Sequence, residues 1–392
     1  MPAFFCAIIL YDYNLGDGVL GVKKPRLAAI EYIRGISMLG VVGIHVGSQY
    51  LSNPAANMHL VALFEVVTRF SVPIFFFISA FGMFYNLDLT QPFNYKSFLK
   101  RRISTVVIPY VVWSLFYLVH YAVLWGDTSV LSPFYMLFSM FFGTAGYQLY
   151  FMVILLWFYL MMPVWVWMVQ RLNMLWLAGL LAFQIVFDYW SCFVLNSAGV
   201  ENFLLRSLID YRLNYWVLHY IFIFVWGGYL AVHISWFKEL MKHYRSSLTA
   251  FFWLSLAGLL GYYYWLIFSR GYTPLEGINT AQQLCPAGII YTLGASLFFF
   301  AVFTEWRMPE WLKPVFAALG RHSYFVYLAH PVAITYLGIA LAEKGQIMTA
   351  PAALCFFAAV VVITLGAAAA MRRLGEKIPL INELSIGVYK KK

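Results

Sequence analysis

Arg34 and His45 are the two residues whose types and spacing most clearly suggest chemistry in this chain. They lie eleven residues apart. On one helix that is close to three turns, so both side chains face the same way about 16 Å apart. A guanidinium can bind phosphate through its planar fork, and an imidazole can take up or release a proton near neutral pH. Ionisable groups are costly in an apolar helix, which makes the pair a candidate site.

The residues around this pair divide the same helix into two faces. Glu31 lies about one turn before Arg34 and is close enough to orient its guanidinium. Gly40, Gly43 and Gly47 fall on roughly the opposite face, and the last two have the small-xxx-small spacing that favours close helix packing. A snorkelling arginine and a hydrogen-bonded structural histidine would fit the spacing equally well, so the chemical interpretation depends on the rest of the chain.

The composition predicts an all-α, polytopic integral membrane protein. Of the 392 residues, 63% are hydrophobic and only 11% are charged. A soluble chain carries about 25% charged residues. The net charge of +10 comes mostly from short loops between apolar segments. Charge in such loops encodes membrane orientation, so we expect the lipid bilayer as a partner and no nucleic acid.

Apolar segments long enough to cross a bilayer recur about ten times along the chain. Most Lys and Arg residues fall in loops on one side, and the opposite loops hold only Arg206, Arg212, Arg270 and Lys344. The positive-inside rule therefore predicts about ten transmembrane helices with both termini cytoplasmic. Residues 134–143 are apolar but too short to span, which predicts a re-entrant or interfacial piece. The expected spans are 27–47, 59–85, 103–125, 149–169, 174–190, 213–236, 248–268, 286–303, 316–341 and 350–371.

The expected domain organisation is one transmembrane domain with two short ends. Residues 1–26 form a cytoplasmic leader, 27–371 the transmembrane domain and 372–392 a basic cytoplasmic tail. The four cysteines show no metal-binding spacing. Cys192 and Cys285 both lie near expected outer helix ends, where a disulfide is one option, although unpaired apolar thiols are the default.

Charged residues and a proline interrupt the second span. Glu65 and Arg69 lie four residues apart, so they are expected to pair. Pro73 is expected to break the helix, and residues 71–82 to form bent backbone that lines a cavity. The alternative is a neutralised buried pair with only a structural role.

Polar groups also mark the third and ninth spans. Arg101 and Arg102 precede the third span and could attract a polyanion, although ordinary positive-inside charges would look the same. Ser323, Tyr327 and His330 share one face of the ninth span. This stripe predicts either a lined pore or polar groups bonded to neighbouring helices.

Four stretches together resemble the acyltransferase-3 family of membrane-bound acyltransferases. Each one alone is weak, but four in this order across residues 27–371 are specific. They are EYIRGISM at 31–38, with ten residues between Arg34 and His45; SVPIFFFISAF at 71–81, similar to the family's VPLFFxxSGF; FLKRR at 98–102, leading to IPY at 108–110; and LGRHSYFVYLAH at 319–330, similar to LGxxSYxxYLxH.

The chain departs from the family pattern in three ways. Ala80 stands where the family usually has Gly. Gln148 stands where some members carry a His before the fourth span, which puts a role for that side chain in doubt. No hydrolase-like extracytoplasmic domain follows the tenth span, so a second acyl-transfer step on this chain is not expected.

The resemblance implies an acyl-CoA-dependent O-acyltransferase, which moves an acyl group, often acetyl, to a hydroxyl of an envelope or extracellular carbohydrate. Arg34 and His45 match the family's essential pair, and Arg102 matches a basic position before its third span. With Arg101, these arginines would bind acyl-CoA, Glu31 would orient Arg34, and His45 would act as general base or transient acyl carrier. No metal is expected. The residues expected to line the pore or the acceptor site are Glu65, Arg69, Ser79, Gln148, Ser323, Tyr327 and His330.

The alternative function is a transporter or flippase that exports a glycan or a lipid-linked sugar. The same polar residues would then line a path, not a reaction centre. The chain shows no internal repeat of the kind that builds many transporters, and its charge clusters near one helix, which favours the enzyme. The resemblance implies a multi-pass protein of a cell membrane, typically the bacterial plasma membrane, and leaves the acyl group, the sugar and the oligomeric state open.

Overall fold

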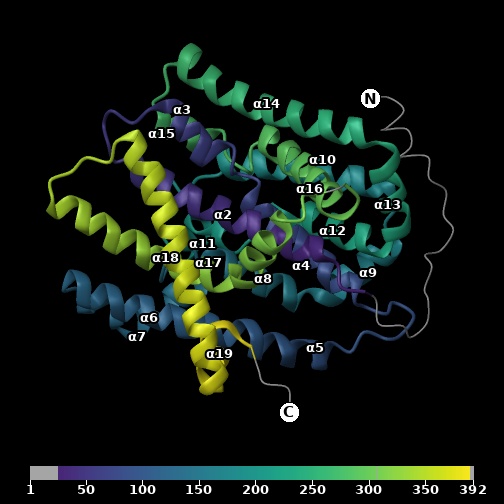
Figure 1. Ribbon diagram of the computed structural model, residues 1–392, viewed down its shortest axis with the longest axis horizontal. Coiled ribbons are helices and arrows are strands. Elements are labelled where there is room, and N and C mark those ends of the chain that lie inside the picture. Colours follow the sequence, from purple (N-terminus) through teal and green to yellow (C-terminus); the bar gives the residue numbers. More distant parts are fainter. Residues whose placement is uncertain (1–24, 307, 389–392) are drawn as a thin grey trace.

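The computed structural model describes residues 25–306 and 308–388, shown as ribbon in Figure 1. The protein is 80% helical, and the described residues contain no β-strand. This confirms the all-α prediction. The predicted leader lies almost wholly outside the described residues, as does the end of the predicted tail.

Within the described residues, eight helices are long and apolar enough to cross a membrane, and two bent helix pairs raise the total to as many as ten. The expected polytopic membrane fold is therefore confirmed. The eight are α2 (Ala28–Tyr50), Met58–Tyr85 (α3, η1 and α4), Tyr95–Trp125 (α5, η2 and α6), α10 (Met174–Phe193), α14 (Arg245–Arg270), α16 (Pro286–Thr304), α17 (Leu312–Glu343) and α18 (Ala350–Lys377).

The fourth and sixth expected spans, predicted as single helices, are instead sharply bent. α8 (Tyr150–Leu160) and α9 (Met162–Arg171) meet at 67°. Pro163 lies in the first turn of α9, where a missing N–H is tolerated but continuation of the preceding helix is not. The segment Val217–Val232, which ends in α12 (Ile221–Val232), meets α13 (Ile234–His243) at 95°.

The break in the second span lies before Pro73, so the prediction of its position was wrong. η1 (Ala62–Val66) is a π-turn, and residues 67–70 form turns between it and α4 (Ser71–Tyr85). Pro73 lies in the first turn of α4, where proline fits a helix without breaking it. Residues 71–82, predicted as bent backbone, are regular helix.

Three short helices connect the long ones. α7 (Pro133–Phe142) is the half-length apolar segment expected from the sequence. α11 (Phe203–Asp210) and α15 (Pro274–Thr280) lie within the two longer connections. Ring contacts between Phe138 of α7 and Phe203 of α11 hold two of these short helices together.

α2 and α17 run side by side in the same direction and form the centre of the fold. A Cβ at Gly320 would overlap the carbonyl group of Glu31, so the two backbones touch where the first turn of α2 meets the third turn of α17. Further along, a Cβ at Gly338 would lie 3.7 Å from the amide nitrogen of Gln49. Close approach through small residues is how helices associate within a membrane, where lipid supplies no hydrophobic driving force.

The glycine face of α2 packs closely against another helix, as predicted, and that partner is the second span. A Cβ at Gly40 would overlap the hydroxyl of Ser71 on α4, and one at Gly47 would lie 2.8 Å from the Cβ of Phe64. α2 is therefore held between α4 and α17, in the middle of the helices in Figure 1.

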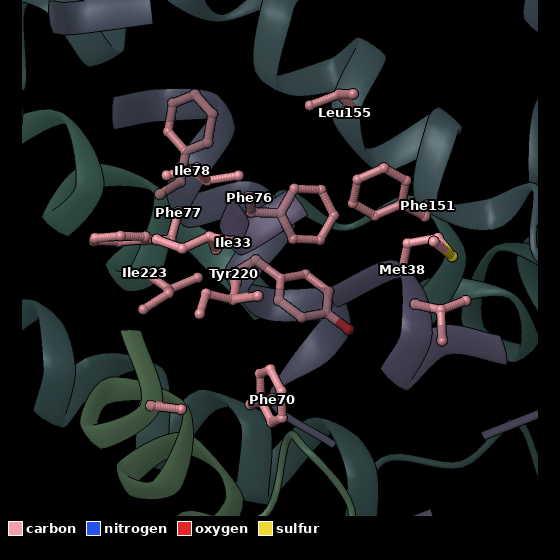
Figure 2. Close-up of a cluster of buried hydrophobic side chains, with 14 of the residues drawn as sticks. Ile33, Met38, Phe70, Phe76, Phe77, Ile78, Phe151, Leu155, Tyr220 and Ile223 are labelled. Carbon is pink, nitrogen blue, oxygen red and sulfur yellow. The ribbon is translucent and has the colours of Figure 1, made fainter. Parts of the chain in front are cut away.

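Aromatic side chains fill the core beside α2. Figure 2 shows Ile33 and Met38 near Phe76, Phe151 and Tyr220, which come from three other elements. Phe76 lies 4.6 Å from both Phe151 and Tyr220, measured between ring centroids. The three rings contribute about 1 kcal/mol per pair beyond the area that they bury, and they fix the face of α2 that remains for the polar residues.

The end of the chain folds back onto the membrane helices. α18 runs on to Lys377, and α19 (Pro379–Ile386) then packs against the start of α6 (Ile108–Trp125). The indole nitrogen of Trp113 donates to the carbonyl of Ser385 at 2.9 Å. Gly387 has φ 63° and packs on the backbone of Thr105, which no larger residue would allow.

Candidate active site between α2 and α17

His45 and His330 stack on each other at one end of the α2–α17 contact. Their ring centroids are 5.1 Å apart and their planes are inclined by 23°. Tyr147, just before α8, covers His45 at a centroid distance of 4.4 Å. The sequence placed both histidines in the site, and the structure brings them together. We call this side of the molecule the His45 end.

The imidazole of His330 has a defined tautomer. Its Nδ1 lies 3.1 Å from the carbonyl oxygen of Val326, which can only accept, so Nδ1 carries the hydrogen. Nε2 then presents a lone pair, and it is buried without a hydrogen-bond partner among the described residues. A buried acceptor without a partner is costly in a protein interior, so a ligand group is expected opposite it.

Arg34 lies at the other end of the same contact, which we call the Arg34 end. Its ionisable neighbours are Tyr159, Glu31, Arg102 and Arg26. Glu31 forms its ion pair with Arg26, not with Arg34 as proposed from the sequence. No carboxylate in the described part of the chain forms an ion pair with Arg34, which leaves its guanidinium available for an anion.

Arg102 joins this end of the site and Arg101 does not. The guanidinium of Arg102 lies over the ring of Tyr159 at 4.8 Å and over that of Phe98 at 5.1 Å. Its Nε is buried without a partner in the described chain. Arg101, the other predicted donor-binding residue, is exposed. Arg34 and Arg102 therefore flank Tyr159 from two different helices.

Two buried hydroxyl groups without partners in the described chain lie near the Arg34 end, and neither was predicted as a site residue from the sequence. Tyr324 lies near Tyr159, and its buried hydroxyl has no partner in the described chain. The hydroxyl of Ser37, one turn after Arg34 on α2, is also buried without a partner in the described chain. With 28 tyrosines in the chain, residue type alone could not single out Tyr324.

Three of the predicted lining residues use their polar groups for structure. The hydroxyl of Tyr327 donates to the carbonyl of Gln148 at 2.5 Å, and the side-chain nitrogen of Gln148 donates to the carbonyl of Leu328 at 3.4 Å. The hydroxyl of Ser323 donates to Gly320 in its own helix at 2.8 Å. The side-chain oxygen of Gln148 is the exception, because it is buried and unpaired in the described chain.

The predicted pair between Glu65 and Arg69 is present beside the His45 end. Nη2 of Arg69 lies 3.0 Å from Oε2 of Glu65, and the Glu65 side chain is only 1% exposed. Ser48, three residues after His45, donates to the second oxygen of Glu65 at 2.8 Å. Arg69 is a charged neighbour of His45. Ser79, also predicted to line the site, is half buried on α4, and the described contacts do not connect it with the histidines.

A second buried polar cluster lies outside this site and was not anticipated. Asp188 of α10 contacts Nδ1 of His219 at 2.7 Å, and Nε2 of His219 lies 3.4 Å from the hydroxyl of Ser191. Arg212 donates to the carbonyls of Ser191, Leu195 and Ile209. An acidic residue within an apolar span was the available sequence signal.

The described cysteines do not form disulfides. Cys192 and Cys285 are free thiols, and Cys285 accepts from the backbone of Gly288 at 3.3 Å. The described residues contain no group of three or more metal-ligating side chains.

The two ends of the site carry different kinds of polar group. Unpaired groups that can donate gather at the Arg34 end, where they suit phosphate and carbonyl oxygens. Imidazole lies at the His45 end, where it suits proton transfer or attack on an acyl carbon. The contact between α2 and α17 therefore places groups suited to an anion at one end and two imidazoles at the other.

Comparison with known proteins identifies the family. A family model described as an acyltransferase domain matches residues 27–371, the range that the four motifs predicted. No curated protein and no solved structure matches the chain. The matched range contains α2, α17 and both ends of the site. The chain therefore belongs to the acyltransferase-3 family of multi-pass membrane proteins.

Proposed function

We propose that this protein transfers an acyl group, acetyl in the simplest case, from acyl-coenzyme A to a hydroxyl of a carbohydrate. The donor enters at the Arg34 end, and the acceptor meets it at the His45 end. The positive-inside rule assigns the Arg34 end to the cytoplasm, where acyl-coenzyme A is made, and the His45 end to the outer side of a bacterial plasma membrane.

The observation that carries this proposal is the polarity of the unpaired groups along α2 and α17. At one end Arg34 and Arg102 offer guanidinium hydrogens that no carboxylate of the described chain neutralises. At the other end His45 and His330 offer imidazole nitrogens. Acyl-coenzyme A, with phosphates at one end of a long arm and a thioester at the other, matches this order of groups. Transport of a neutral sugar would not require guanidinium groups at one end and imidazoles at the other.

The distance between the two ends fits the donor. Arg34 and His45 lie eleven residues apart on the uninterrupted helix α2, which corresponds to about 16 Å along its axis. A pantetheine arm has comparable length. With its phosphates held by Arg34 and Arg102, the thioester would reach the histidines, and Tyr324 and Ser37 would supply hydrogen bonds along the way.

His45 acts on the reaction centre in one of two ways. As a general base it would take the proton of the acceptor hydroxyl, and as a transient acyl carrier it would attack the thioester carbon. Either role needs a free nitrogen at the end of the donor arm. Tyr147 and His330 both contact the ring of His45 and lie 6.3 Å from each other, so packing within this group of three rings holds His45 at that point.

The test is the variant His45→Ala in membranes that contain it at the wild-type level. With radiolabelled acetyl-coenzyme A, we expect wild-type membranes to label the cell's own glycans. In the variant the labelling rate should fall at least about 100-fold, the smallest effect typical of a lost acid–base group. His243→Ala, which changes an exposed histidine, is the control. Glycan labelling that survives in His45→Ala would refute the mechanism.

The same assay separates the enzyme from a transporter. Release of free coenzyme A that depends on His45 supports acyl transfer. Export of glycan by the wild-type protein without any thioester turnover would refute the proposed function and leave a transport role.

A further inference from the structure

The His45 end contains two buried acceptors for which the described protein supplies no donor. One is Nε2 of His330 and the other is the side-chain oxygen of Gln148. Gln148 is attached to α17 just before His330, because its side-chain nitrogen donates to the carbonyl of Leu328. Both atoms are almost completely shielded, since the two residues are 0% and 1% exposed.

Two buried acceptors at the same end of the site call for a ligand that presents two hydrogen-bond donors. The groups around them are otherwise satisfied, because Tyr327 donates to the backbone of Gln148 and Tyr117 donates to the backbone of Leu328. The thioester group of acyl-coenzyme A presents only acceptors, so that part of the donor cannot satisfy these atoms. Adjacent hydroxyl groups of a sugar can.

We propose that His330 is the general base for the acceptor hydroxyl, and that Gln148 receives a second hydroxyl of the same acceptor. This assignment rests on the proposed acyl-transfer function and deepens it, because it selects an acceptor with two neighbouring hydroxyls. His45, on the same helix as Arg34, is then the histidine that faces the thioester.

The tautomers support this division of roles. The bond from Nδ1 of His330 to Val326 fixes the proton on that nitrogen and leaves Nε2 as a base. His45 has ring contacts with Tyr147 and His330 but no hydrogen bond in the described chain that would fix its tautomer. A base held in one tautomer needs no reorientation before it accepts a proton.

The chemical step balances without another reactant. The acceptor oxygen forms a bond to the acyl carbon while its proton moves to Nε2 of His330. The carbon–sulfur bond breaks, and sulfur leaves with the electron pair. That sulfur then takes the proton from His330, which gives free coenzyme A and restores the neutral imidazole.

The test compares His330→Gln with the wild-type protein in membranes supplied with radiolabelled acetyl-coenzyme A. Glutamine keeps a group that can donate to Val326 but cannot accept a proton. We expect glycan labelling to fall about 10²- to 10⁴-fold, the usual contribution of a positioned base. The apparent KM for acetyl-coenzyme A should stay within about twofold, because the donor end is untouched. His120→Gln, which alters a histidine bonded to Tyr336 on another helix, is the control and should keep wild-type labelling.

A second variant keeps the proposal testable if His330→Gln is poorly inserted. His330→Ala leaves a cavity, and added imidazole should restore at least about tenfold of the lost labelling if the missing group is a base. His45→Ala should not respond in the same way. Wild-type labelling in His330→Gln, or absence of rescue in correctly inserted His330→Ala, would overturn the role of His330. Absence of labelling by the wild-type protein itself would instead refute the proposed function.

Gln148→Leu tests the second hydroxyl. It removes the unpaired acceptor and keeps a similar volume. We expect glycan labelling to fall about tenfold, which corresponds to one lost hydrogen bond. Hydrolysis of acetyl-coenzyme A in the absence of glycan should be unchanged. Unchanged glycan labelling would refute the role of Gln148.

Discussion

The two buried polar regions of this protein differ in how completely their groups are paired. In the Asp188 cluster, His219 uses both ring nitrogens and Arg212 donates to three carbonyls and a hydroxyl, so only one oxygen of Asp188 is left without a partner. Along α2 and α17, unpaired atoms recur from Arg102 to His330. A paired network stabilises a fold, whereas a series of unpaired groups is arranged for something that binds.

Their surroundings differ in the same sense. The Asp188 cluster joins α10 to the connection that follows it, and its three core residues Asp188, Ser191 and His219 are completely buried. The α2–α17 contact joins helices from opposite ends of the chain, and Arg34 and His45 remain partly exposed. We therefore assign stability to the first region and function to the second, and three experiments test that separation.

Arg212→Met should produce the largest effect, and it should be on stability. It removes the side chain that donates to the carbonyls of Ser191, Leu195 and Ile209, a loss of about 3–5 kcal/mol at about 1–3 kcal/mol for each acceptor left unpaired. Thermal unfolding in detergent measures it. Arg206→Met, which removes the exposed partner of Asp210, is the control and should cost less than about 1 kcal/mol.

The comparison predicts that folded Arg212→Met protein still works. Its glycan labelling per folded molecule should match that of the wild-type protein. A selective loss of labelling with unchanged unfolding temperature would show that the Asp188 cluster takes part in the reaction.

Arg34→Ala should affect donor binding at little cost in stability. The guanidinium forms no ion pair with a carboxylate of the described chain, so its removal should cost little stability. Because it would bind the donor's phosphates, its loss should raise the apparent KM for acetyl-coenzyme A by about 10- to 100-fold. Steady-state release of coenzyme A measures the change. Arg101→Ala removes an exposed charge of α5, next to Arg102, and should change KM less than about threefold, because exposed charges are screened. Equal effects of the two variants would remove Arg34 from donor binding.

The sequence predicted the elements of this site better than their interactions. The spacing of Arg34 and His45 and the glycine face of α2 follow from helix geometry alone, which any α-helix obeys. The partner of Glu31 did not follow, because Arg26 and Arg34 are both within reach of it along the chain. Competing local partners are decided by rotamers and packing.

The bends and the second polar cluster show two other limits. Pro163 accounts for the bend between α8 and α9. The sequence alone could not predict that bend, because a proline that begins a new helix looks the same in sequence as one that kinks a continuous helix. Asp188 and His219 lie 31 residues apart on different elements, so no periodic pattern connects them. Contacts of this kind depend on tertiary packing.

The smallest expected effect comes from two tyrosines one turn apart on α17. Tyr324 has an unpaired hydroxyl, whereas the hydroxyl of Tyr327 donates to the carbonyl of Gln148 at 2.5 Å. Tyr327→Phe should therefore cost about 1 kcal/mol of unfolding free energy and leave the KM for acetyl-coenzyme A unchanged.

Tyr324→Phe should show the opposite pattern. Removing a buried hydroxyl that has no protein partner cannot lose a hydrogen bond of the free protein, so stability should hold or rise slightly. If that hydroxyl meets the donor arm, the KM for acetyl-coenzyme A should increase about five- to tenfold. Thermal unfolding and coenzyme A release, measured on both variants, give four values. Identical patterns in the two variants would mean that an unpaired hydroxyl does not mark the donor path.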